Sequence, residues 1–342
     1  MRVLVTGGAG FIGGYVVRRL LKLNHDVFNV DKFGYASSIL SIDKLFKDKD
    51  NKTLGAHHLL KVNLCNLKYI EELVVEVKPD LIIHLAAESH VDRSISGPEE
   101  FLKSNVIGTF NLLEASRKYW ENLSPKKKET FRFHHVSTDE VFGSLPKDGN
   151  FSEDTAYDPR SPYSATKASS DHLVNAWHHT YGLPILLTNC SNNFGPWQFP
   201  EKLVPVVITR AYKSKSIPIY GDGLNIRDWL FVEDHVDAIF MVLENGRIGE
   251  SYCIGGYGEK TNLELVKQIC SIMDKKIPSD KPYASLIKFI EDRAGHDKRY
   301  AIDPDKITRE LGWKPKFSFE KGLEITVEWY LKNQKWCENS LN

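Results

Sequence analysis

Short apolar runs alternate with longer amphipathic segments along the first half of the chain. A short apolar run predicts a buried strand, and apolar residues spaced three and four apart predict a helix. The predicted strands cover residues 3–6, 26–31, 59–63, 81–85, 133–137 and 185–190, and the predicted helices cover residues 10–23, 67–77, 101–119 and 162–181. This alternation is typical of an α/β fold in which helices cover both faces of a parallel sheet.

Beyond Cys190 the pattern breaks into shorter pieces that are interrupted by proline and glycine. Helices are expected near residues 233–244, 262–273 and 319–332, and the intervening segments are irregular. We therefore predict a first domain over residues 1–190 that is rejoined by residues 230–255. A smaller α+β lobe is predicted over residues 191–229 and 256–335.

The composition excludes several classes of protein. The 342 residues include 45 basic and 45 acidic side chains, so the net charge is zero, which disfavours a general nucleic-acid or membrane-surface binder. The basic run at 126–128 is expected to be a solvated loop. No apolar stretch approaches the roughly 18 residues of a membrane span. The five cysteines are scattered and favour a reducing cytoplasm, and the twelve histidines show no metal-ligand spacing, so no metal is expected.

A glycine-rich turn follows the first predicted strand and opens the first predicted helix. Its glycines are Gly7, Gly10 and Gly13. Glycines at this spacing allow a tight turn, close approach of backbone amides to a pyrophosphate, and packing of the helix on the sheet. Asp31 ends the second strand, where a carboxylate can accept hydrogen bonds from ribose hydroxyls and repels a 2′-phosphate. These features predict a Rossmann-type, doubly wound sheet that binds NAD rather than NADP.

Candidate catalytic side chains lie at two places in the sequence. Tyr163 and Lys167 are four residues apart at the start of a predicted helix, so both face the same side, where an ammonium can lower the pKa of the phenol. Asp139 and Glu140 follow the fifth predicted strand, at the edge where an open α/β sheet binds its ligands. Two acids at this edge suit an elimination, which needs one group to remove a proton and another to protonate a leaving hydroxyl.

The turn together with the Tyr163 and Lys167 pair resembles the extended short-chain dehydrogenase/reductases. Longer stretches narrow the resemblance to the dTDP-glucose 4,6-dehydratases, and it covers essentially the whole chain. The matching stretches are residues 85–94, 138–140, 189–196, 200–203, 220–229 and 293–300. The departures are small: Asn63 stands where the family usually has aspartate, and Phe142 and Phe194 replace tyrosines.

The resemblance implies a lyase that dehydrates dTDP-glucose to the 4-keto-6-deoxy sugar nucleotide and regenerates a tightly bound NAD in each cycle. In the family's mechanism Tyr163 is the base for the C4 hydroxyl, and Thr138 and Lys167 orient the hydroxyl and the nicotinamide ribose. Glu140 removes the C5 proton and Asp139 protonates the C6 hydroxyl, so that water leaves. C4 oxidation, C5/C6 elimination and return of the hydride to C6 then complete the reaction.

The same resemblance assigns the binding residues and the two parts of the chain. The cofactor contacts are Gly7, Gly10, Phe11, Ile12, Gly13, Asp31, Lys32, Asn63, Leu64, Leu85, Ala86, Ala87, Ser104, Tyr163, Lys167 and Asn193. The substrate contacts are Ser89, Thr138, Asn192, Lys202, Leu203, Pro218, Tyr220, Arg227, Asn262, Arg293 and His296. The first domain would hold NAD and the smaller lobe would hold the nucleotide sugar.

Alternatives remain open at this point. The same reaction on UDP-glucose is the nearest, because the contacts that select the base cannot be identified from the sequence. A nucleotide-sugar 4-epimerase or decarboxylase would not need Asp139, since neither reaction expels the C6 hydroxyl. An NAD-dependent scaffold without turnover is disfavoured by the complete catalytic set. By analogy with the family, a homodimer is expected through the helices at 101–119 and 162–181, with no nucleic-acid or membrane partner.

Overall fold

The computed structural model describes residues 1–48 and 53–341. Its main feature is a seven-stranded parallel sheet with the strand order β11-β6-β5-β4-β1-β2-β3. The strands are β1 (Arg2–Thr6), β2 (Asp26–Asp31), β3 (His57–Lys61), β4 (Leu81–His84), β5 (Arg132–Thr138), β6 (Ile185–Cys190) and β11 (Ser251–Ile254). The chain runs outward from β1 in one direction and from β4 in the other, so the order reverses between these strands. The predicted doubly wound α/β class is confirmed.

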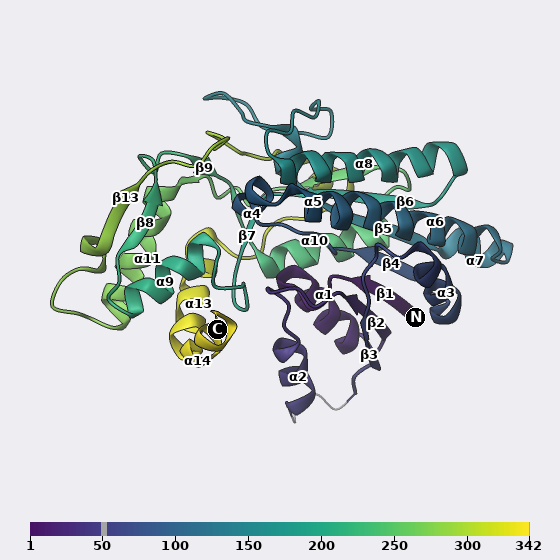
Figure 1. The fold of residues 1–342 in the computed structure, drawn as a ribbon, viewed down its shortest axis with the longest axis horizontal. Coiled ribbons are helices and arrows are strands. Elements are labelled where there is room, and N and C mark those ends of the chain that lie inside the picture. The colour runs from purple at the N-terminus through teal and green to yellow at the C-terminus, as the bar shows by residue number, and fades with distance from the viewer. Residues whose placement is uncertain (49–52, 342) are drawn as a thin grey trace.

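Helices cover both faces of this sheet (Figure 1). One face carries α3 (Leu67–Val77), α6 (Gly108–Glu121) and α8 (Pro162–Tyr181), and the other carries α1 (Phe11–Lys22), α2 (Leu40–Lys47) and α10 (Val232–Asn245). Successive residues of a strand point to opposite faces, so Leu4 of β1 packs in the first core and Val5 in the second. Both side chains are fully buried, as expected for a parallel sheet.

The predicted helix at 101–119 is helical throughout, but it is not α-helical throughout. The structure has α5 (Pro98–Phe101), a π-helical segment (Leu102–Ile107) and then α6. The buried side chain of Asn105 lies in the π segment, where it accepts from the backbone amide of Glu88 and donates to Thr166 Oγ1 at 2.9 Å. A π turn changes the helical phase, which places Asn105 where both partners can be reached.

The smaller lobe packs around its own apolar core and lies beside the sheet, on the left in Figure 1. Its helices are α9 (Leu203–Tyr212), α11 (Asn262–Lys276), α13 (Phe319–Lys332) and α14 (Gln334–Leu341). Its strands form short pairs, which are β8 (Ile217–Tyr220) with β13 (Ile287–Ile290), β9 (Ile226–Arg227) with β12 (Lys260–Thr261), and β7 (Asn192–Phe194) with β10 (Trp229–Phe231). The remaining helical segments are α4 (Val91–Ser96), α7 (Pro125–Thr130), α12 (Asp305–Leu311) and the 3₁₀ turns at Asp139–Phe142 and Tyr283–Leu286.

Two further differences from the sequence-based expectations concern local structure. The lysines at 126–128 lie in the exposed helix α7 rather than in a loop. The prediction contained no helix at 203–212, because Pro205 interrupts the segment; the proline stands in the first turn of α9, where its missing amide costs no helical hydrogen bond. Within the described residues, no helix is long and apolar enough to cross a membrane.

The segment at 230–255 adds β11 beside β6 and places α10 against α1. The chain therefore passes from the sheet to the smaller lobe and back before it ends in α13 and α14 (Figure 1). The assignment of the two parts to a cofactor and a nucleotide sugar stays a prediction.

Candidate active site

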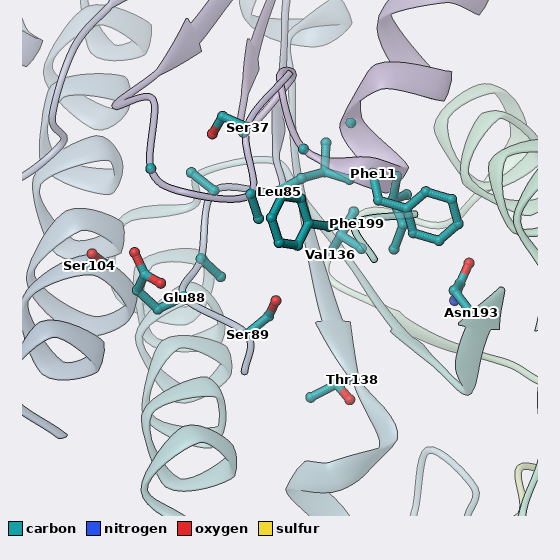
Figure 2. A pocket seen from close by; sticks show the side chains of 18 of the residues that line it. Phe11, Ser37, Leu85, Glu88, Ser89, Ser104, Val136, Thr138, Asn193 and Phe199 are labelled. Atoms are coloured by element: carbon teal, nitrogen blue, oxygen red, sulfur yellow. The ribbon is translucent and has the colours of Figure 1, made fainter. Parts of the chain in front are cut away.

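A cleft of about 350 Å³ opens at the carboxyl ends of β1, β4 and β5, where the strand order reverses. This is the position at which doubly wound sheets bind their ligands. In Figure 2 the cleft is bordered by Phe11 near the first turn of α1, by Thr138 at the end of β5, and by Asn193 on β7. It therefore reaches from the glycine turn to the first segment of the smaller lobe.

The glycine turn has the form that a bound pyrophosphate requires. Gly7 has φ +74°, and a Cβ on it would lie 2.7 Å from the backbone nitrogen of Ala86. A Cβ on Gly13 would lie 2.1 Å from the carbonyl oxygen of Gly7. The cap residue of α1 is Gly10, which has no side chain to bond the first amides of that helix, so these amides are free to bind an anion.

The carboxylate of Asp31 is held at the edge of the cleft by three donors. Its Oδ2 accepts from the backbone of Ala9 at 3.1 Å, and its Oδ1 accepts from the backbone of Phe33 at 2.8 Å and from Ser37 Oγ at 2.9 Å. A fixed carboxylate at the end of β2 suits a ribose diol and disfavours a 2′-phosphate. The turn and this carboxylate together fit NAD.

The neighbouring Lys32 is already paired within the protein. Its ammonium lies 2.6 Å from Glu88 Oε1 and donates to Ser104 Oγ at 2.9 Å. Because Lys32 is paired with Glu88, its positive charge is not free to bind a 2′-phosphate on the ribose. The pair also ties the end of β2 to the segment after β4.

The structure brings all of the predicted cofactor residues to this cleft. The lining includes Gly7, Gly10, Phe11, Ile12, Gly13, Asp31, Lys32, Asn63, Leu64, Leu85, Ala86, Ala87, Ser104, Tyr163, Lys167 and Asn193. The predicted acids and the substrate residues Ser89, Asn192 and Lys202 also line it. The other predicted substrate residues belong to the smaller lobe, beyond the lining of this cleft, and are Leu203, Pro218, Tyr220, Arg227, Asn262, Arg293 and His296.

The two acids occupy a 3₁₀ turn directly after β5. Asp139 is 1% exposed, its Oδ1 accepts from Thr138 Oγ1 at 3.3 Å, and its Oδ2 has no hydrogen-bond partner within the described chain. Burial, and then the charge of Glu140, raise the pKa of Asp139 well above its usual value. An acid with an elevated pKa stays protonated near neutral pH and can donate a proton.

Glu140 lies in a different electrostatic environment. Burial raises its pKa, but the cations Arg293, Arg227 and Lys202 all oppose that rise. The pKa values of the two neighbouring carboxyl groups are therefore shifted by different amounts. This favours Asp139 as the acid and Glu140 as the base. Thr138 stabilises the turn, because its hydroxyl accepts from the backbone amide of Glu140 at 3.3 Å.

Tyr163 and Lys167 lie on the first two turns of α8. Ser161 caps this helix in a reciprocal capping box, and Pro162 occupies its first position. Burial raises the pKa of Tyr163 well above its usual value, and a hydrogen bond with Thr138 opposes this effect. The Lys167 ammonium is buried and donates to the carbonyl of Val136 at 3.0 Å. The phenol, the hydroxyl of Thr138 and the two acids thus border one side of the cleft.

Side chains of the smaller lobe face this group. Arg227 is buried, donates to the carbonyl of Asp297 at 2.9 Å and stacks on Tyr300. Arg293 lies 3.2 Å from Asp92, a residue of α4 that also accepts from Tyr220 at 3.3 Å. Arginines suit the bidentate binding of phosphate oxygens. His296 pairs with Asp292 at 2.6 Å, and Asn262 begins α11.

Several residues that line the cleft were not predicted from the sequence, among them Tyr35, Ser37 and Phe199. The hydroxyl of Tyr35 donates to Glu201 at 2.7 Å, and its ring packs against Phe199. The guanidinium of Arg93 lies over the Tyr35 ring, 3.5 Å from its centroid. Tyr35 comes from an irregular segment after β2, where no periodicity marks a buried or bound position.

The fold and the cleft define an NAD-binding enzyme of the extended short-chain dehydrogenase/reductase type. The family model for GDP-mannose 4,6 dehydratase matches residues 4–326, and the chain belongs to this family of sugar-nucleotide 4,6-dehydratases. The dTDP-glucose 4,6-dehydratase of Shigella flexneri is 52% identical over 99% of this chain and 95% of its own length. That of Neisseria meningitidis is 51% identical over 100% of this chain and 96% of its own length.

Solved structures agree with these relatives. The dTDP-glucose 4,6-dehydratase of Bacillus anthracis, in complex with NAD, is 41% identical with a TM-score of 0.84 over 99% of each chain. The Streptomyces venezuelae enzyme, with NAD and a ligand designated TYD, is 40% identical with a TM-score of 0.88 over 99% of this chain and 100% of its own. The UDP-glucose 4-epimerase of Thermotoga maritima has the same fold at 28% identity, with a TM-score of 0.83 over 98% of this chain and 100% of its own.

Proposed function

We propose that this protein is a lyase that converts dTDP-glucose into dTDP-4-keto-6-deoxyglucose with NAD as a cofactor that is regenerated in each turnover. The observation that carries the proposal is the pair of acids after β5. Asp139 is enclosed, has a raised pKa and presents an unpartnered oxygen, while the cations of the smaller lobe keep Glu140 closer to ionisation. An epimerase has no step in which such a buried acid is needed.

The first part of the reaction belongs to Tyr163. Its phenolate accepts the proton of the C4 hydroxyl, which Thr138 orients through its own hydroxyl. The ammonium of Lys167 on the next turn of α8 stabilises the phenolate and faces the cofactor ribose. When bound, NAD supplies the redox chemistry by taking a hydride from C4 and giving it back at C6.

The second part of the reaction belongs to the two acids. Oxidation at C4 acidifies the proton on C5, and Glu140 removes it. Asp139 gives its proton to the C6 hydroxyl, which leaves as water and forms a double bond between C5 and C6. After the reduction at C6, a proton returns to C5 and the 4-keto-6-deoxy product is complete.

The smaller lobe would hold the nucleotide diphosphate. Arg227 and Arg293 come from β9 and from the segment before Tyr300, and both act on Glu140 from the side of that lobe. Guanidinium groups at this border can bind the two phosphates and so place the sugar between Tyr163 and the acids. Substrate binding therefore joins the two parts of the chain.

The proposal is tested by incubating the purified protein with dTDP-glucose, UDP-glucose and buffer alone. Mass spectrometry should detect a product that has lost one water from dTDP-glucose, and NMR should show a methyl group at C6. If the protein dehydrates UDP-glucose but not dTDP-glucose, the substrate is the UDP sugar and the proposed dTDP sugar is wrong. A C4 epimer, or no product from any sugar nucleotide, would contradict the dehydratase assignment.

Asp139→Asn tests the acid directly. The amide keeps the shape of the side chain but cannot donate a proton to the C6 hydroxyl. Turnover should fall by about 10²- to 10⁴-fold, while oxidation at C4 persists, so the reduced cofactor should accumulate and be visible by its absorbance. Normal turnover of this variant would remove Asp139 from the acid role.

We also propose a homodimer that associates through α6 and α8, and a place in the reducing cytoplasm. The exposed apolar residues Leu102 and Ile107 on the π segment that precedes α6 support a contact on this side. The five cysteines are all free thiols, which suits a reducing compartment. Light scattering of the purified protein should give twice the mass of one chain.

A further inference from the structure

A buried carboxylate, Asp171, lies one turn beyond the catalytic lysine on α8. It is 0% exposed and holds four polar neighbours. Its Oδ2 accepts from Ser137 Oγ at 2.7 Å, from Tyr157 OH at 3.0 Å and from Asn189 Nδ2 at 3.2 Å. Burial raises the pKa of Asp171, and the charge of Lys167 and then these three donors oppose the rise, because a carboxylate only accepts hydrogen bonds.

A histidine ring contacts both the second oxygen of Asp171 and the Lys167 ammonium. His135 Nε2 lies 3.1 Å from Asp171 Oδ1 and 3.2 Å from the Lys167 ammonium, and the ring is 1% exposed. We assign the proton to Nε2, because this tautomer gives the carboxylate a fourth donor; the protonated nitrogen cannot accept from Lys167, so Asp171 acts on the ammonium by its charge and not through a hydrogen-bonded chain. Burial, and then the charge of Lys167, hold the pKa of His135 far below its usual value, so the ring is neutral. A neutral ring thus separates an ammonium from a carboxylate.

The other titratable groups around this cluster do not supply a counter-charge. His84 on β4 packs 5.1 Å from the His135 ring and contacts the hydroxyls of Thr6 and Thr109, and burial keeps it neutral by lowering its pKa. On β6, burial raises the pKa of the Cys190 thiol, which keeps it protonated. His134 next to His135 is also neutral because burial lowers its pKa to about 3. Tyr157 donates a hydrogen bond to the carboxylate and stays neutral, because burial and then the charge of Asp171 raise its pKa.

We infer that Asp171 is a positioning residue for the proposed reaction, because across the ring of His135 it provides the buried negative charge that keeps Lys167 an ammonium beside Tyr163. The inference rests on the proposed function for the role of Lys167. Burial lowers the pKa of Lys167, and the charge of Asp171 is the first influence that opposes this change. An unpaired charge in such a site is costly, so removing either partner should discharge the other.

The pairing can be measured without turnover, through the pH dependence of thermal stability. In Asp171→Asn the folded-state pKa of Lys167 should fall further below its unfolded value, so the folded protein binds fewer protons than the unfolded chain. Stability relative to the unaltered protein is then lost as the pH falls, and the deficit in Tm should grow by at least about 2 °C between roughly pH 9 and pH 6.

Lys167→Met should show the opposite dependence. Burial already raises the pKa of Asp171, and the charge of Lys167 is the first influence that opposes this rise. Without the ammonium the folded-state pKa should rise further above its unfolded value, so the folded protein keeps a proton that the unfolded chain releases. The stability of this variant relative to the unaltered protein is therefore lost as the pH rises. Its deficit in Tm should grow by at least about 2 °C between roughly pH 6 and pH 9. This variant keeps the test decisive if Asp171→Asn does not fold.

Ser170→Ala is the matched control, because Ser170 is equally buried on α8 and, among the described residues, bonds only backbone carbonyls of Asn105 and Thr166. It removes a hydroxyl without changing a charge, so its Tm deficit should be the same at every pH. If Asp171→Asn and Lys167→Met also give deficits that do not vary with pH, Asp171 has a structural role only and the inference is wrong.

A kinetic test separates this inference from the proposed function. In the Asp139→Asn protein, formation of the reduced cofactor reports C4 oxidation; its absence there would contradict the proposed function itself. Adding Asp171→Asn should slow this oxidation by about tenfold or more and move the alkaline limb of its pH profile to lower pH. In a Lys167→Met background the same change should have no further effect, since the group it acts on is gone. An unchanged rate and profile in the first case would overturn the inference.

Discussion

Tyr163 shows how the site is organised at the scale of one residue. Burial opposes the ionised form that a base requires, and the Thr138 hydrogen bond on one side counters that effect. In the proposed mechanism, the Lys167 ammonium on the next turn of α8 adds to this stabilisation. A phenol in this environment can ionise only when its neighbours are in place, which restricts its action as a base to the assembled site.

Tyr163→Phe should therefore abolish the first proton transfer while leaving the fold intact. The ring still packs against Phe101, because only the hydroxyl is lost. We expect C4 oxidation to slow by about 10²- to 10⁴-fold, and no reduced cofactor should accumulate even in the Asp139→Asn background. Stopped-flow absorbance of the cofactor measures this rate.

The control is a buried tyrosine in the other lobe. Tyr283 is 7% exposed, and its hydroxyl donates to the carbonyl of Ile277 at 3.0 Å. Tyr283→Phe should lower stability by about 1 kcal/mol and leave the oxidation rate unchanged. Rapid oxidation by the Tyr163→Phe protein would assign the base to another group.

The residues of the site differ in how far the sequence alone could identify them. Asp139, Glu140 and the Tyr163 and Lys167 pair lie in short stretches whose spacing indicates their chemistry. Tyr35 gave no such signal, because its partner Glu201 is 166 residues away. For side chains of this kind, the function follows from contacts that exist only after the sheet and the smaller lobe have assembled.

At the scale of elements, the strongest periodic segments were predicted well. The bounds of α3, α8, α13 and β6 agree with the sequence prediction, because each is a clear apolar pattern with a defined start. The π segment before α6 was not predicted, since its register depends on the tertiary partners of Asn105. The short strand pairs of the smaller lobe were not predicted either, because pairing between distant segments leaves little local signal.

The junction of β1 and α1 supports a prediction about an element. In Gly13→Ala the new Cβ would lie 2.1 Å from the carbonyl oxygen of Gly7, so the turn and the helix must separate. We expect a loss of stability of about 2 kcal/mol or more and weaker binding of NAD, because the amides at the start of α1 would move. Thermal unfolding and titration calorimetry with NAD measure the two effects.

The next glycine in α1 provides the matched control. A Cβ on Gly14 would meet Ser41 Oγ at 3.2 Å, which a small side-chain movement can relieve. Alanine also favours a helix interior by about 1 kcal/mol over glycine, so Gly14→Ala should change stability little and leave NAD affinity intact. Equal losses in both variants would show that the turn is not specifically adapted to the cofactor.

At the scale of the whole molecule, the zero net charge conceals an uneven distribution. The cations Lys202, Arg227 and Arg293 all act on Glu140 at the border between the sheet and the smaller lobe. A ligand bound by these cations would bring its own negative charges, so the net charge of the free protein differs from that of the protein with its ligand. The sequence count excluded a general polyanion binder, but only the fold shows where the cations gather.

Hydrogen bonds join the two parts of the chain at the cleft. Lys202 of the smaller lobe donates to the carbonyl of Ser89 at 2.9 Å. The Tyr35 hydroxyl adds a bond of 2.7 Å to Glu201, and both residues line the cleft. In the proposed reaction NAD is regenerated in each turnover and need not dissociate. Contacts that slow its release are therefore compatible with turnover.

Tyr35→Phe tests one of these contacts at the scale of the molecule. The ring should keep its contact with Phe199, while the bond between the two parts of the chain is lost. Since one hydrogen bond contributes about 0.5–1.5 kcal/mol, NAD should dissociate about 2- to 13-fold faster, with little change in the rate of C4 oxidation when NAD is saturating. Competition with excess labelled NAD measures the release rate. Tyr69→Phe, on the exposed face of α3, is the control and should release NAD at the original rate. If Tyr35→Phe also does so, the bond to Glu201 does not retain the cofactor.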